Sequence, residues 1–160
     1  MGASGWDYRV TYAGSLEQTL AVAQQEILAG NDYIWPWEDY DPEYLDGEPV
    51  PRPASLDELA AAKTAEVFWE EGTHTLLDVE RICGVADEDD FAAIRPLSAK
   101  ELVAVFGTEQ PTPGDFERVY EPGPGGALGD LMGPKWSGRS LAIHDSGKPA
   151  EVFFWGWSGD

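Results

Sequence analysis

The side chains best suited to acid–base, metal or nucleophilic chemistry are few in this chain. There are two histidines, His74 and His144, and a single cysteine, Cys83. Apolar and polar residues alternate over 74–83, which predicts a β-strand with His74 and Asp78 on one face. A strand would separate these two side chains by about 13 Å, too far for one metal ion to bridge. We therefore predict no catalytic residue, no metal site and no cofactor.

Carboxylates are abundant, and one hypothesis is that some of them line a ligand-binding pocket. Aromatic walls with a few carboxylates are suited to binding a cation or a sugar. The pocket of a small-molecule-binding protein or hydrolase would then lie beneath residues 31–54. Its polar residues would be Glu70, His74, Asp78 and Glu80. This hypothesis predicts that burial raises the pKa of at least one of these carboxyl groups.

The most unusual segment is 31–54, where aromatic and acidic residues are interleaved with five prolines. The prolines exclude a continuous helix or a central strand, so we expect a long loop. Two interpretations stay open: the aromatic rings cover the core, or some of them face outward as anchors for a protein partner. In the second case the predicted partner-binding residues are Trp35, Trp37, Glu38, Asp39, Tyr40, Asp41, Glu43 and Tyr44.

The charge of the chain limits the classes of partner. Ten basic and thirty acidic residues give a formal net charge of −20, which opposes direct binding to nucleic acid or to anionic membranes. Residues 1–80 hold 17 acidic and 3 basic residues, whereas residues 81–160 hold 13 and 7. No apolar stretch approaches a membrane span, and no signal peptide is expected. A lone Cys83 fits a reducing cytoplasm.

The pattern of elements predicts one α+β domain over residues 6–160, after a flexible leader at 1–5. Mixed elements without regular βα alternation favour a mainly antiparallel sheet with two or three helices on one side. Strands are expected at 6–12, 74–83 and 91–97, with a C-terminal β-hairpin at 140–144 and 150–155. Helices are expected from Ser15 to Gly30, from Ser55 to Glu71 and from Ser98 to Phe106, each beginning at a capping serine.

These observations favour an acidic cytoplasmic inhibitor that binds a basic protein. Such an immunity- or antitoxin-like protein would neutralise a bacterial toxin, such as a nuclease, by covering its positive cleft. The small-molecule or hydrolase hypothesis is the first alternative. An accessory subunit of a larger complex is the second, and it predicts a flat apolar patch. No motif in the chain points to a family, and the oligomeric state stays open.

Overall fold

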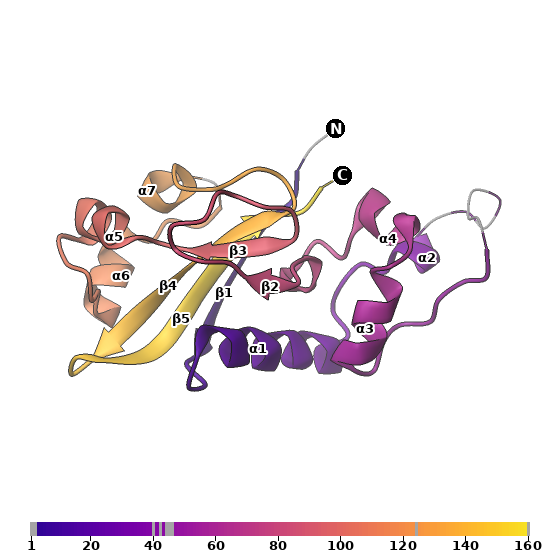
Figure 1. The fold of residues 1–160 in the computed structure, drawn as a ribbon, viewed down its shortest axis with the longest axis horizontal. Helices are drawn as coiled ribbons and strands as arrows, with labels where there is room; N and C mark the ends of the chain where they lie inside the picture. Colours follow the sequence, from indigo (N-terminus) through magenta and orange to yellow (C-terminus); the bar gives the residue numbers. More distant parts are fainter. Residues whose placement is uncertain (1–2, 40, 42, 44–46, 124, 160) are drawn as a thin grey trace.

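The computed structural model describes residues 3–39, 41, 43, 47–123 and 125–159, together with the secondary structure but not the side chain of Asp39. Strands and helices alternate irregularly along the chain (Figure 1). The elements are β1 (Gly5–Thr11), α1 (Leu16–Gly30), α2 (Pro36–Asp39), α3 (Leu56–Ala62), α4 (Glu66–Glu71), the 3-10 helix η2 (Leu76–Asp78), β2 (Arg81–Ile82), β3 (Ala93–Pro96), α5 (Ala99–Phe106), α6 (Pro113–Val119), α7 (Gly126–Gly129), β4 (Ser137–Asp145) and β5 (Lys148–Trp157).

One five-stranded sheet with the order β1-β5-β4-β3-β2 organises the molecule. β5 pairs antiparallel with both β1 and β4, which confirms the C-terminal hairpin and its long strands. β3 pairs parallel with β4 on one side and with β2 on the other. The α+β class is therefore confirmed, and most of the pairing is antiparallel as expected. The sheet is mixed in detail, because the short strand β3 pairs parallel with both of its neighbours.

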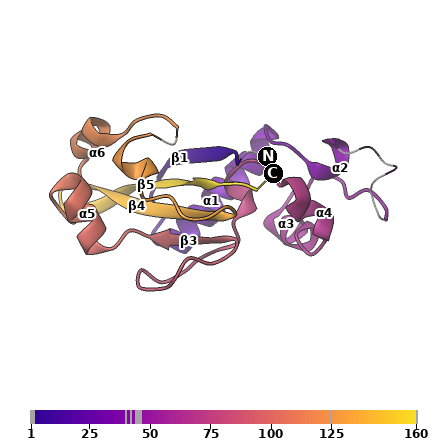
Figure 2. The same ribbon diagram turned by 90° about the horizontal axis from the view of Figure 1, so that it is seen from above.

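Helices cover both faces of the sheet, rather than the one face that we expected (Figures 1 and 2). On one face, Trp6, Val152 and Phe154 pack with α1 and η2. On the other face, Phe153 and Trp155 pack with α5, α6 and α7. The period of two along β5 explains this arrangement, because successive large side chains of one strand point into opposite layers.

Local capping signals place several helices correctly. The Ser98 hydroxyl accepts a hydrogen bond from the Glu101 amide, and the Glu101 carboxylate accepts one from the Ser98 amide. These two bonds confirm the predicted capping box of α5. At α3 the Ser55 hydroxyl accepts the Glu58 amide, whereas the Glu58 carboxylate accepts the amide of Ala54 instead of that of Ser55.

Two predicted elements are wrong in detail. The helix expected from Ser55 to Glu71 is divided into α3 and α4. The strand expected at 74–83 begins with η2 and retains only the two residues of β2. In η2, Leu76 packs in the cluster of Val152 and Phe154, whereas Leu77 packs in the cluster around Trp35. These two consecutive leucines therefore point in different directions, and both are buried. A strand with one solvent-exposed face cannot do this.

Candidate functional site

Residues 31–71 form the region that we call the acidic lobe, which consists of α2, α3, α4 and the segments that connect them. Figures 1 and 2 both place this lobe at one end of the molecule, beyond the end of the sheet. It contains twelve acidic residues and only two basic ones, Arg52 and Lys63. The lobe is thus the part of the fold that carries most of the excess negative charge of the N-terminal half.

The aromatic residues of 31–39 form the interior of the acidic lobe. Trp35 is fully buried, and its ring centroid lies 5.1 Å from that of Trp37 and 6.1 Å from that of Phe68. The Trp35 indole Nε1 donates to the carbonyl of Val50 at 2.7 Å, which ties the two ends of the predicted loop together. Tyr33 and Trp37 are also buried. These rings cover the core, and Trp35 and Trp37 are not the surface anchors that one interpretation expected.

Three of the four carboxylates predicted to bind a partner are described, and they lie outside this aromatic interior. Glu38, Asp41 and Glu43 are exposed. The segment therefore buries Tyr33, Trp35 and Trp37 and leaves these three acids in solvent, a combination that the sequence pattern does not reveal. Tyr40, Tyr44 and the side chain of Asp39 lie outside the residues that the structure describes.

Both basic residues of the acidic lobe are already engaged. The Arg52 guanidinium contacts the Glu38 carboxylate at 2.7 Å, donates to the carbonyl of Tyr33 and lies over the ring of Tyr33. Hydrogen bonding to Arg52 lowers the pKa of Glu38. Lys63 is buried. Within the described part of the lobe, no cation is therefore left to neutralise the exposed carboxylates of Asp41, Glu43 and Glu48.

Lys63 is the C-cap residue of α3, and its side chain is buried. Its Nζ donates to the carbonyl of Val79 at 2.8 Å and lies 5.7 Å and 5.9 Å from the ring centroids of Phe68 and Trp69. Burial lowers the pKa of Lys63 to about 8, and the negative charge of Asp78 opposes this effect. Lys63 also lines a cavity of about 540 Å³ between α1, α3 and the 79–82 segment.

Asp78 is the one carboxylate that is buried among the described residues. One oxygen accepts the amide and the hydroxyl of Thr73 at 2.7 and 2.8 Å, and the other accepts the amide of His74 at 3.1 Å and the hydroxyl of Ser158 at 2.5 Å. Desolvation by burial raises the pKa of Asp78 despite these four hydrogen bonds. This group fastens the end of β5 to the turn before η2.

The other residues of the alternative pocket do not join Asp78 in one cluster. His74 lies close to Asp78 in space, not about 13 Å away as a strand would place it. Its imidazole Nε2 instead lies 3.3 Å from the Glu71 carboxylate. Glu70 and Glu80 are exposed. The predicted combination of acids and a base is thus split between the interior and the surface.

Sequence reasoning missed the groups that hold Asp78. Ser158 is eighty residues away from Asp78 in the chain, so no local pattern could have paired them. The start of η2, in contrast, has a local signal in the sequence. Thr75 is followed three residues later by an acid, Asp78, which is typical of a helix start. Its hydroxyl accepts the amide of Leu77 at the beginning of η2.

Over the described residues, no helix is both long and apolar enough to cross a bilayer. In the same residues, no group of three or more His, Cys, Asp or Glu side chains is arranged to hold a metal ion. No protein-family model, no curated protein and no solved structure matches the chain.

Proposed function

We propose that this chain is an acidic cytoplasmic inhibitor that neutralises a basic protein, in the manner of an immunity protein or an antitoxin. A nuclease or another toxin with a positive cleft is the class of target. One observation carries the proposal: the acidic lobe exposes Asp41, Glu43 and Glu48, while both of its cations are paired or buried. A surface of one sign steers and orients a partner of the opposite sign.

The buried rings support this proposal indirectly. Trp35 and Trp37 hold the 31–54 segment against α4, and the indole of Trp35 fastens its far end through Val50. A segment that is ordered before binding loses less conformational entropy in the complex. The rings thus fix the described residues on both sides of the acidic stretch, whose carboxylates would pair with Lys and Arg side chains of the target.

A cytoplasmic location is part of the proposal. The Cys83 thiol donates to the carbonyl of Ile94 at 3.3 Å, and burial raises its pKa, so the protonated thiol is favoured. A protonated, half-buried thiol fits a compartment in which cysteines stay reduced.

The alternatives have weaker support. For a hydrolase, Asp78 is enclosed by four donors, and neither of the two cavities described here has a lining residue from 31–54. For an accessory subunit, the large hydrophobic residues that are exposed in the described chain are spread over α1, residues 85–91 and α5. Because they belong to three separate segments, they give no support to the flat apolar patch that this hypothesis predicts.

Capture of a partner from cells of the source organism tests the proposal. The tagged protein is incubated with extract at about 50 mM and about 300 mM salt, and co-eluting proteins are identified. We expect one basic protein in stoichiometric amount, weakened or lost at the higher salt. Recovery of no specific protein at either salt would overturn the proposal.

A further inference from the structure

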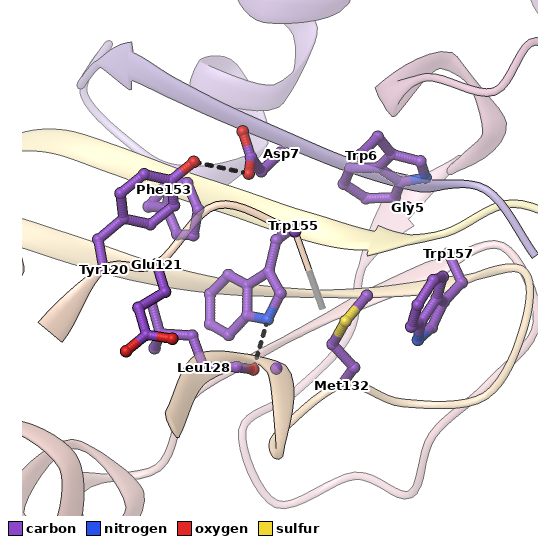
Figure 3. Close-up of a pocket in the computed structure, with 12 residues that line it drawn as sticks. Gly5, Trp6, Asp7, Tyr120, Glu121, Leu128, Met132, Phe153, Trp155 and Trp157 are labelled. Atoms are coloured by element: carbon purple, nitrogen blue, oxygen red, sulfur yellow. Dashed lines mark hydrogen bonds between the residues drawn. The ribbon is translucent and has the colours of Figure 1, made fainter. Parts of the chain in front are cut away.

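A second region of the molecule has the chemistry of a ligand site. A cavity of about 280 Å³ lies between the β1–β5 edge of the sheet and the chain that links α6 to α7 (Figure 3). None of its lining residues belongs to the acidic lobe. Its volume suits a small organic molecule better than a single water or metal ion.

The floor of the cavity is aromatic. Phe153, Trp155 and Trp157 occupy alternate positions of β5 and therefore face the same side of the sheet. The rings of Phe153 and Trp155 are stacked with their centroids 5.2 Å apart. The Trp155 indole Nε1 donates to the carbonyl of Leu128 at 3.0 Å, as Figure 3 shows, so this ring is held in place before any ligand binds.

The rim of the cavity is acidic. Asp7 and Glu121 are exposed at its edge, and the Tyr120 hydroxyl donates to one carboxylate oxygen of Asp7 at 2.9 Å (Figure 3). Glu121 lies across the start of α7, where a Cβ on Gly126 would be only 3.2 Å from its carboxylate. All the charged side chains that line the cavity are carboxylates.

We propose that this cavity binds a small organic cation with an alkylated ammonium head. The face of an aromatic ring attracts a cation, and methyl groups on the ammonium reduce the cost of removing it from water. The carboxylates of Asp7 and Glu121 add attraction for positive charge and repel anions. The site goes beyond the proposed inhibitor function, because it lies outside the acidic lobe and uses different residues.

The positive head of the ligand would lie between the aromatic floor and the acidic rim of the cavity. The buried floor of Phe153 and Trp155 and the half-buried Trp157 offer apolar contact, while the carboxylates lie toward solvent. A methylated ammonium satisfies both, because its alkyl groups contact the rings and its charge stays near the rim. A bare divalent ion would need more oxygen ligands than two separate carboxylates supply.

Titration with choline, followed by the indole N–H signals of the ¹⁵N-labelled protein, tests this proposal. We expect the Trp155 and Trp157 signals to shift in the millimolar range, while the signal of the fully buried Trp35 stays in place. The Trp157→Phe variant assigns the signal of residue 157. A neutral analogue, 3,3-dimethyl-1-butanol, has the same shape without the charge. Equal binding of choline and this alcohol would overturn the proposal. So would the absence of any shift of the indole signals with both choline and a neutral peptide that carries one trimethyl-lysine.

Variants and a second probe sharpen the test. Trp157→Leu, and separately the pair Asp7→Asn with Glu121→Gln, should each weaken choline binding by about tenfold. The matched control Glu109→Gln removes an exposed acid outside the cavity and should leave binding unchanged. A neutral peptide with one trimethyl-lysine separates the two sources of the same head group. Tighter binding of choline assigns a free molecule, and tighter binding of the peptide assigns a modified side chain. Unchanged binding in both sets of cavity variants would contradict the assignment.

Discussion

At the scale of single residues, the buried carboxylate of Asp78 links the residue after β5 to the turn before η2. It accepts four hydrogen bonds from Thr73, His74 and Ser158 in a site that is closed to solvent. Asp78→Ala leaves these donors without an acceptor, and we expect the free energy of unfolding to fall by about 3–5 kcal/mol. Urea denaturation measures this change. The control Glu80→Ala removes an exposed neighbour and should leave the urea midpoint in place; equal midpoints for both variants would contradict the role of Asp78.

Lys63 makes stability depend on pH. Burial lowers its pKa in the folded state to about 8, below its ordinary value of 10.5. Between these two values the unfolded chain binds more protons than the folded one, so the free energy of unfolding should rise with pH. Lys63 alone should contribute about 3 kcal/mol to this rise. The measurement compares urea unfolding of the wild type and of Lys63→Met from about pH 7.5 to about pH 10.5. Parallel curves for the two proteins would show that Lys63 does not titrate in this window.

At the scale of elements, the 31–54 segment depends on one ring. Trp35 is fully buried among Tyr33, Trp37 and Phe68, and its indole also bonds to Val50. Trp35→Ala should lower the free energy of unfolding by about 3–5 kcal/mol through loss of packing. Chemical denaturation checks the value, with the exposed Glu48→Ala as control. A loss below about 1 kcal/mol would mean that the segment is not anchored by this ring.

The sequence predicts those elements whose signals are local. Ser98 and Glu101 are three residues apart and form the expected capping box, and the alternation along 150–155 identifies β5. The prediction of a strand at 74–83 is wrong, because the directions of the Leu76 and Leu77 side chains are set by two separate clusters. Composition likewise reveals that 31–54 is acidic and aromatic. It cannot show that Trp35 and Trp37 are buried while Asp41 and Glu43 are exposed, because the burial of the two rings depends on packing against α4.

At the scale of the whole molecule, the exposed carboxylates of the acidic lobe and the aromatic cavity of about 280 Å³ lie in different places. The acidic lobe extends beyond the end of the sheet, whereas the aromatic cavity lies against the β1–β5 edge. The sequence suggested that aromatic walls and carboxylates would meet beneath 31–54. The structure brings this combination together around Trp155 instead, through residues from both ends of the chain. The surface that we propose for a basic partner and the cavity that we propose for a small cation thus use different residues.

The most direct test of the central claim compares two charge-neutralised proteins in the capture experiment. One carries Asp41→Asn, Glu43→Gln and Glu48→Gln in the acidic lobe. The matched control carries Glu109→Gln, Asp130→Asn and Asp145→Asn, three exposed acids outside the lobe. Both variants lose three negative charges, so a general effect of net charge would weaken partner binding equally in the two. We predict that the lobe variant loses the basic partner at about 150 mM salt while the control retains it. Retention by the lobe variant, or equal loss from both, would contradict the account.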